Sequence, residues 1–307
     1  MTSNIDELVQ RAIITATGSP PASSSRIPIG ESNQVYDVAT EDGQHVIVRM
    51  SYESDPVFEH ERWAIERCAE HGISVPRVLL VERVSLDPPI SICIETKLDG
   101  VSLDTLLREH AGSPDKIAAL VRQAGAMLAR IHAVPTSRFG WIRPDGVGNR
   151  PSWASFMRKW GEKRDELVAS GARIGVGARD IDGAIEILLQ PHAEYQDVEP
   201  RLVHGDYTPE HILLVAGRIS GVIDFGNCLS GDPAYDFAWW DYFRGEALPV
   251  AWLIEGYRGD AASLESRMRL AKLHLAFGFV EYYAITGNLR GIELTKLHLA
   301  RGLAALA

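Results

Sequence analysis

The early part of the chain holds short apolar runs of the strand type. These runs stand at 27–50, 78–84 and 90–94. A Glu-Asp-Gly turn at 41–43 divides the first of them into antiparallel strands, with a further apolar alternation at 46–50. Helices are expected over residues 1–13, which are amphipathic, and over 55–71. The Ser- and Pro-rich residues 19–25 predict a loop instead.

The later part of the chain is mainly helical in its pattern. Residues 116–132 carry apolar side chains at the spacing of one helix face. Residues 152–168 predict another helix with Trp153, Phe156 and Trp160 on one side, and these rings are expected in the core. Short apolar runs interrupt the helices and predict strands at 202–203, 212–215 and 221–223.

The stretch from Leu202 to Ala238 holds the candidate chemistry. It contains a His-Gly-Asp triplet ending at Asp206, a possible ligand five residues later at His211, and an Asp-Phe-Gly triplet beginning 18 residues after Asp206, at Asp224. Phosphoryl transfer needs one carboxylate to orient the attacking hydroxyl, a second to hold magnesium on the phosphates, and another group to support the metal. Because loops and strand ends carry these side chains, both carboxylates are expected at one edge of a small sheet.

These motifs resemble those of the aminoglycoside and macrolide phosphotransferases, which share the protein-kinase-like fold. His-Gly-Asp in place of His-Arg-Asp, and GDPAYDFA after the Asp-Phe-Gly, are similar to this antibiotic-kinase branch. The resemblance extends from about Ile27 to the C-terminus. It implies an α+β, two-lobed kinase-like fold. Residues 1–98 would form a small β-rich nucleotide-binding lobe, and residues 99–307 a large, mainly helical catalytic and substrate-binding lobe.

The metal position departs from the common pattern of that family. The resemblance implies Asp206 as the catalytic residue, with Asp224 and His211 as ligands of Mg²⁺ carried by ATP or GTP. Most members have Asn where this chain has His211, although His is common in macrolide phosphotransferases. Because magnesium prefers oxygen to imidazole nitrogen, the alternative stays open that His211 only hydrogen-bonds its own loop. His204 and Asp236 are expected to hold the catalytic loop without a chemical role.

The same resemblance implies nucleotide contacts in the early part of the chain. Segment 30–33 corresponds to the loop over the phosphates, although its single glycine by itself favours an ordinary hairpin turn. Arg49 takes the place of the strand lysine that contacts the phosphates, and Glu61, or its neighbour Glu59, is its helix partner. Segment 95–98 is the hinge that binds the nucleobase. The implied nucleotide-binding residues are Gly30, Ser32, Asn33, Arg49, Glu61, Glu95 and Lys97.

The acceptor is expected to be a small hydroxylated molecule, an antibiotic of the macrolide class or an aminoglycoside such as hygromycin. Ammonium groups need carboxylates, whereas a macrolide needs an apolar floor and one carboxylate for its amino sugar. The segment FGFVEYYAITGN is similar to the tail of macrolide kinases. Each candidate taken singly is equally well explained as a packed or solvated helix position. The candidate substrate residues are Asp241, Glu246, Glu281 and Tyr282.

Composition narrows the function classes. A formal net charge of −10 argues against nucleic acid as a partner. No apolar run reaches the roughly 20 residues of a membrane helix, and Cys68, Cys93 and Cys228 lack any pairing or zinc motif, which favours the cytoplasm. The sequence therefore predicts a nucleotide-dependent O-phosphotransferase. A metabolic kinase for an amino alcohol or sugar, and a non-catalytic nucleotide-binding pseudokinase, remain as alternatives.

Overall fold

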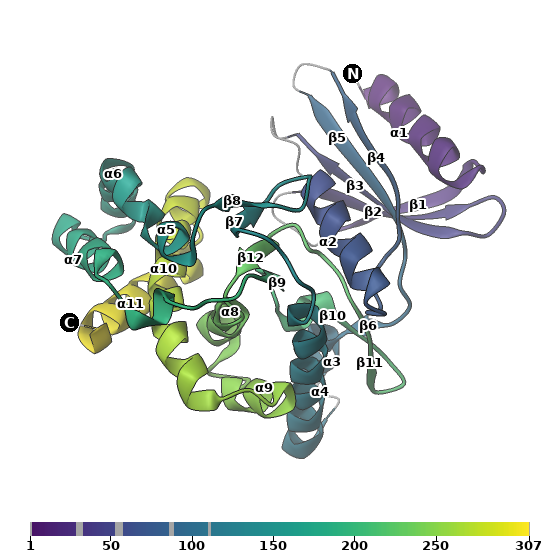
Figure 1. The fold of residues 1–307 in the computed structure, drawn as a ribbon. Helices are drawn as coiled ribbons and strands as arrows, with labels where there is room; N and C mark the ends of the chain where they lie inside the picture. Colours follow the sequence, from purple (N-terminus) through teal and green to yellow (C-terminus); the bar gives the residue numbers. More distant parts are fainter. Residues whose placement is uncertain (1, 29–32, 53–57, 86–88, 110–111, 307) are drawn as a thin grey trace. The chain divides into compact units, whose positions relative to one another are not determined.

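The computed structural model describes residues 2–28, 33–52, 58–85, 89–109 and 112–306 (Figure 1). The chain forms two compact units, each made of several stretches. Unit 1 contains residues 1–110, 143–146 and 209–228, and unit 2 contains 111–142, 147–208 and 229–307. The predicted lobe boundary between residues 98 and 99 stays a prediction.

Unit 1 carries most of the strands and unit 2 most of the helices. The elements of unit 1 are α1 (Thr2–Thr17), β1 (Pro21–Ile27), β2 (Gln34–Thr40), β3 (His45–Ser51), α2 (Glu59–Glu70), β4 (Val78–Val84), β5 (Ile90–Thr96), β6 (Val101–Ser102), α3 (Leu103–Arg108), η3 (Pro209–His211), β10 (Ile212–Val215) and β11 (Arg218–Val222). The elements of unit 2 are α4 (Pro114–His132), β7 (Phe139–Ile142), β8 (Gly148–Arg150), α5 (Trp153–Met157), η1 (Arg158–Lys163), α6 (Arg164–Ile174), α7 (Ala178–Leu189), η2 (Ala193–Tyr195), β9 (Arg201–Val203), β12 (Leu229–Gly231), α8 (Ala234–Arg244), α9 (Val250–Tyr257), α10 (Ala261–Thr286) and α11 (Leu289–Leu306).

A five-stranded antiparallel sheet forms the centre of unit 1. Its strand order is β1-β2-β3-β5-β4, and the predicted turn at 41–43 joins β2 to β3. Helix α1 packs on β4 and β5, where Ile13 joins Val48 and Ile92 in a buried apolar cluster. In such a sheet every second side chain of a strand points to the same face, so apolar side chains on one face can pack against α1. The predicted strands and the N-terminal helix are confirmed.

Strand β1 corrects the loop expected over 19–25. It begins at Pro21 and pairs with β2, with Ser24 opposite Val38. Its serines are exposed, so no apolar alternation marks it in the sequence. It lies at the edge of the sheet, where a proline at the first position costs no ladder hydrogen bond. The backbone ladder with β2 therefore holds the exposed middle of this strand.

Two smaller sheets carry the loops that contain the candidate carboxylates. Strand β9, which precedes Asp206, belongs to the unit 2 sheet β8-β7-β12-β9. Strand β11, which precedes Asp224, belongs to the unit 1 sheet β11-β10-β6. The expectation that one sheet edge holds both carboxylates stays a prediction; the loop of Asp206 leads into β10, whose first residue pairs with the last residue of β11, Val222, and Asp224 follows shortly after it. The partner of β9 is β12, a strand of only three residues whose pattern the sequence does not distinguish from a loop.

The helices of unit 2 build its core. Helix α4 begins at Pro114, after the N-cap Ser113, and so matches the predicted helix closely. The helix predicted over 152–168 breaks instead into α5, η1 and α6. Gly161 lies inside the 3₁₀ segment, where its low helix propensity favours the interruption. The predicted aromatic residues of this region are nevertheless buried.

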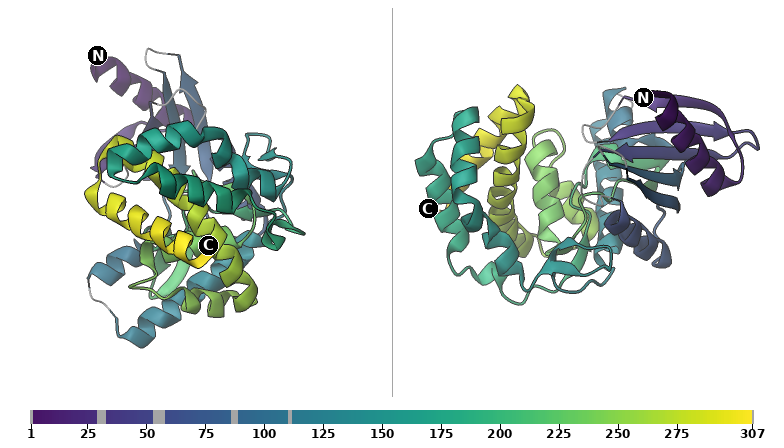
Figure 2. Two further views of the ribbon diagram at one scale, coloured as in Figure 1. Left: turned by 90° about the vertical axis from the view of Figure 1, so that its left-hand side faces the viewer. Right: turned by 90° about the horizontal axis from the view of Figure 1, so that it is seen from above.

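Helix α10 is the longest of the described helices and organises the rest of unit 2. It packs against α8, α11 and α6 (Figure 2). Among the described residues, no helix combines the length and the apolar content that a membrane span requires. The three cysteines are buried and form no disulfide.

Candidate functional site

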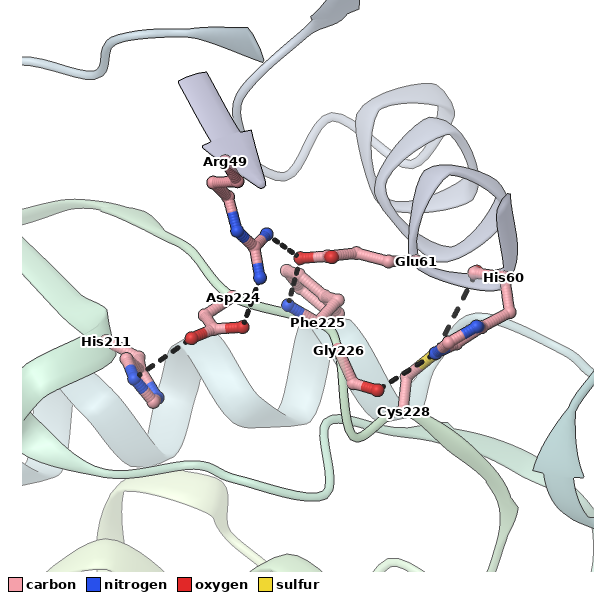
Figure 3. A network of polar contacts seen from close by, with 8 residues as sticks. All are labelled: Arg49, His60, Glu61, His211, Asp224, Phe225, Gly226 and Cys228. Atoms are coloured by element: carbon pink, nitrogen blue, oxygen red, sulfur yellow. Dashed lines mark hydrogen bonds and ion pairs between the residues drawn. The ribbon is translucent and has the colours of Figure 1, made fainter. Parts of the chain in front are cut away.

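A buried arginine joins two carboxylates in unit 1 (Figure 3). Arg49, on β3, donates from Nη1 to Glu61 Oε1 at 2.5 Å and from Nη2 to Asp224 Oδ1 at 3.1 Å. Strand β3 supplies the arginine, helix α2 supplies Glu61, and the turn after β11 supplies Asp224. Because Arg49 is buried, this planar fork fixes both carboxylates at once.

Helix α2 also holds the backbone of the Asp-Phe-Gly turn. The Phe225 N–H donates to Glu61 Oε1 at 3.1 Å, so this oxygen accepts from Arg49 as well. His60 Nε2 donates to the carbonyl oxygen of Gly226 at 2.9 Å (Figure 3). The turn is therefore attached to the helix by consecutive residues, His60 and Glu61.

Asp224 has a left-handed backbone conformation, with φ of 65°. Such a conformation is uncommon for a residue other than glycine and persists only where the surroundings stabilise it. The bonds from Arg49, Glu61 and His60 around the turn supply that stabilisation. The strained backbone lies at the predicted metal-binding residue, as strained residues often do at functional sites.

His211 and Asp224 lie together in unit 1. His211 Nε2 is 3.5 Å from Asp224 Oδ2, and the Asp224 side chain is 42% exposed. Within the described residues, no cluster of three or more metal-ligating side chains occurs. A carboxylate with one neighbouring imidazole fits magnesium, because Mg²⁺ keeps several waters and uses few protein ligands beside the nucleotide phosphates. Glu61 Oε2, buried without a hydrogen-bond partner in the described part of the chain, adds an acceptor in the same cluster.

The charges of this cluster shift one another's proton affinities. Burial by itself disfavours the charged guanidinium, but Glu61, Asp224 and Glu95 hold the pKa of Arg49 well above its ordinary value. Burial raises the pKa of Glu61, against the attraction of Arg49. Burial likewise raises the pKa of Glu95 to about 8. A protonated Glu95 adds no negative charge beside the buried Glu61.

The other predicted nucleotide residues are spread over unit 1. Glu95 lies within β5, on the strand side of the expected hinge, and is buried. Lys97 is exposed, and its Nζ donates to Asp37 on β2 at 2.6 Å. Asn33 stands just before β2 and is half-buried. Gly30 and Ser32 lie outside the described residues.

The loop of Asp206 belongs to unit 2 and is held by a buried carboxylate. Asp236 accepts hydrogen bonds from the backbone N–H groups of His204 and Gly205, both at 2.8 Å. His132 Nε2 donates to the same carboxylate at 2.8 Å. The Asp206 N–H donates to His204 Nδ1 at 3.3 Å. The expected support of this loop by His204 and Asp236 is confirmed, while Asp206 itself is only partly buried.

The predicted acceptor residues fall into two groups on or beside α10. Asp241 and Glu246 line a cavity of about 400 Å³, where Asp241 accepts from Lys272 Nζ at 2.7 Å. Glu281 accepts from Lys163 Nζ at 3.4 Å, and Tyr282 lies next to it on α10. Lys272 and Glu281 are nine residues apart, about two and a half turns, and so face opposite sides of the helix. The structure does not bring all these side chains together.

Some contacts at these sites carry no signal in the sequence. His60 is one of several polar residues on α2, and nothing in its spacing marks a bond to Gly226. Lys159 is one of several basic residues in its segment, yet its ammonium lies over aromatic rings. The contact of His60 with Gly226 and that of Lys159 with Trp141 depend on how separate elements pack.

Family comparison gives an independent view of this fold and site. Residues 23–270 match the family described as the phosphotransferase enzyme family. This match covers most of the chain and includes both candidate carboxylates, Asp206 and Asp224. The chain belongs to this phosphotransferase enzyme family.

Curated relatives match only part of the chain. The hygromycin-B 4-O-kinase of Escherichia coli is 25% identical over 204 residues, which cover 64% of this chain and 55% of that protein. The homoserine kinase of Gluconobacter oxydans (strain 621H) is 26% identical over 121 residues, 39% of this chain and 36% of that protein. The chain therefore spans about half the length of the first relative and less of the second.

Solved structures match the whole fold. The aminoglycoside phosphotransferase APH(4)-Ia has a TM-score of 0.74 at 20% identity, with all of both chains covered. The macrolide 2′-phosphotransferase MphH from Brachybacterium faecium has a TM-score of 0.61 at 17% identity, covering 95% of this chain and 98% of that one. These likenesses confirm the predicted α+β kinase-like fold.

Proposed function

We propose that this protein transfers the terminal phosphoryl group of ATP or GTP to a hydroxyl group of a small molecule. The observation that carries the proposal is the Arg49–Glu61–Asp224 cluster, in which one buried cation fixes a helix carboxylate and a partly exposed carboxylate. A nucleotide-binding site needs a cation for the phosphates and a carboxylate for their metal, and this cluster supplies both.

Each residue then has a distinct role. Asp206 orients the acceptor hydroxyl and takes up its proton, since its loop is fixed through backbone N–H groups. Asp224, with His211 beside it, would hold Mg²⁺, which neutralises charge on the phosphates when it is bound. Arg49 contacts the phosphates, and Glu61 keeps it in place. Positioning and charge neutralisation supply most of the rate.

The acceptor we favour is an antibiotic, a macrolide or an aminoglycoside such as hygromycin. One relative is named for hygromycin B as its acceptor, and a solved structure of similar fold is a complex with ADP and hygromycin B. A metabolic acceptor is the second candidate, because another relative is a homoserine kinase. We further propose a cytoplasmic location and no nucleic-acid partner, in keeping with the net charge of −10.

A phosphate-transfer screen tests this proposal. Radiolabelled ATP and GTP are each offered with Mg²⁺ and with hygromycin B, other aminoglycosides, macrolides and homoserine. We expect transfer to at least one acceptor, and a loss of about 10²-fold or more in turnover for Asp206→Asn. Asp180→Asn, an exposed carboxylate on α7, is the matched control and should keep full turnover. Equal turnover of Asp206→Asn and wild type would contradict the role of Asp206.

A further inference from the structure

A lysine ammonium lies against three aromatic rings in unit 2. Lys159 Nζ is 4.5 Å from the ring centroid of Trp160, 4.7 Å from that of Phe156 and 5.1 Å from that of Trp141. In the described part of the chain, no hydrogen bond or ion pair joins this ammonium to an acceptor. Aromatic faces attract cations through their quadrupoles, and such cages are a common way to bind ammonium groups.

The three rings have different depths, which gives the cage an open side. Phe156 on α5 and Trp160 in η1 are buried and form its floor. Trp141 on β7 is 38% exposed, so one wall of the cage faces solvent. An exposed tryptophan above a buried aromatic floor is accessible to a ligand from outside.

A carboxylate completes the recognition chemistry. Glu281 on α10 lies near enough to act on the charge of Lys159, and it accepts from Lys163 Nζ at 3.4 Å. An aromatic surface with one carboxylate beside it suits a protonated or quaternary amine, because the rings bind the cation and the carboxylate neutralises it. Two lysines of the protein therefore occupy a site that suits an amine: Lys159 lies against the rings, and Lys163 is bound to Glu281.

The resident lysine lies in the cage without hydrogen bonds among the described residues. The pKa of Lys159 is lowered to about 8, chiefly by burial; Lys163 and Arg150 contribute to this shift, and Glu281 opposes it. Nearby, Trp160 Nε1 and His274 Nε2 are buried without hydrogen-bond partners in the described part of the chain. Lys159 therefore loses no hydrogen bond to the described residues when a ligand displaces it.

We propose that Trp141, Phe156 and Trp160, with Glu281, form a subsite for an ammonium group of the acceptor, and that Lys159 occupies this subsite in the unliganded protein. The identification of the ligand as the acceptor rests on the proposed function; the binding chemistry does not. Lys159 then acts as an internal competitor that leaves when an amine-bearing ligand enters. Acceptors without an amine gain nothing from the subsite.

Tetramethylammonium tests the cage apart from catalysis, since this cation has no hydroxyl group to phosphorylate. Its binding is followed by tryptophan fluorescence in the wild type and in Lys159→Met, which keeps the length of the side chain and removes the charge. We expect about tenfold tighter binding by the variant, because the internal cation no longer competes. Lys116→Met, which removes an exposed lysine on α4, is the matched control and should bind as the wild type does.

The pH dependence gives a second, independent readout. Tetramethylammonium keeps its charge at every pH, so only the protein titrates. We expect wild-type affinity to rise between pH 7 and 9 as Lys159 loses its proton, and we expect no such rise in Lys159→Met. The other charged or titratable groups that face this lysine or the cage are present in both proteins, so the difference isolates Lys159. These groups are Lys163, Glu281, Arg150 and His274.

The rim residue Trp141 provides the variant that tests the cage itself. Trp141→Leu changes a partly exposed ring and should leave the fold intact while weakening tetramethylammonium binding several-fold. Unchanged binding in both Lys159→Met and Trp141→Leu would overturn the subsite. If the cage binds the cation as expected but no amine-bearing acceptor is phosphorylated, the proposed function fails while the subsite stands. If amine-bearing acceptors are phosphorylated with a KM that Lys159→Met does not lower, the assignment of the subsite to the acceptor is wrong.

Discussion

The two carboxylates proposed for the reaction are held by different kinds of contact. In unit 1, Asp224 is bound through its side chain to Arg49, which also binds Glu61. In unit 2, the loop of Asp206 is bound through backbone N–H groups to Asp236. The position of Asp224 therefore depends on the charges of Arg49 and Glu61. The position of Asp206 depends on a backbone loop that Asp236 holds.

Burial sharpens this difference. Asp236 is fully buried, whereas the Asp224 side chain is 42% exposed. An exposed carboxylate is available to a metal ion and can change partners when a ligand binds. A buried carboxylate that accepts backbone hydrogen bonds has no such freedom and acts on stability instead. We therefore predict that substitution of Asp236 affects folding first, and that substitution of Asp224 affects charge and binding first.

The largest effect is expected for Asp236→Ala. Removal of this carboxylate leaves the N–H groups of His204 and Gly205 and the imidazole of His132 without their acceptor in a buried site. We expect a loss of about 3 kcal/mol in the free energy of unfolding, measured by urea denaturation. Asp236→Asn keeps one acceptor oxygen and should lose less. If Asp236→Ala had the same urea midpoint as the wild type, Asp236 would not stabilise the loop of Asp206.

A smaller, pH-dependent effect is expected for Glu95→Gln. The folded protein keeps the Glu95 proton up to about pH 8, whereas the unfolded chain releases it near pH 4.3. The folded state therefore binds the extra proton between these values, and wild-type stability falls as pH rises through this window. The glutamine of the variant cannot titrate, so the variant should gain stability relative to the wild type as pH rises from 5 to 8.

Unfolding free energies at pH 5 and pH 8 measure this gain directly. Glu41→Gln, in the exposed turn between β2 and β3, is the matched control and should show no pH-dependent difference. A constant difference between Glu95→Gln and the wild type at both pH values would mean that Glu95 is charged in the folded protein.

The smallest effect is expected for His211→Asn. An amide oxygen suits magnesium at least as well as an imidazole nitrogen, so turnover should stay within about threefold of the wild type. His211→Ala removes the donor and should lose about tenfold or more, chiefly through a higher KM for the magnesium–nucleotide complex. Steady-state kinetics with varied Mg²⁺ separate the two variants. Equal, severe losses in both would show that His211 has a role other than metal binding.

Much of the fold follows from local patterns, and the exceptions have physical causes. Helix α4 carries apolar residues along one face, and the strands β2 to β5 contain short apolar runs, so these elements are visible in the sequence. The sequence does not predict strand β1, because its exposed serines show no apolar alternation and pair with β2 through the backbone. The sequence does not predict strand β12 either, because three residues are too few to show a strand period. The break of the helix over 152–168 falls at the 3₁₀ segment that contains Gly161, and the apolar spacing of the segment does not show it.

The candidate site divides in the same way. Asp206, His211 and Asp224 stand in one short stretch whose spacing itself suggests the chemistry. Arg49 contacts Asp224 across 175 residues of chain, a pairing that the resemblance to a family implies and local pattern does not. The sequence predicts neither the bond from His60 to Gly226 nor the aromatic surroundings of Lys159. The bond from His60 and the contact of Lys159 with Trp141 join elements that are separate in the sequence, whereas Phe156 and Trp160 are close neighbours of Lys159 in the chain.

Unit 1 is built from stretches that lie far apart in the sequence, and this affects the order in which its parts are synthesised. Arg49 and Glu61 leave the ribosome early, but Asp224 and Phe225 follow only after most of unit 2 has been translated. When only the first stretch of unit 1 has been synthesised, Arg49 can pair with Glu61, but Asp224 has not yet been made. Any fragment that stops before residue 228 lacks part of the unit. Unit 1 is consequently begun first and completed late, and a chain that terminates before Asp224 leaves Arg49 without this partner.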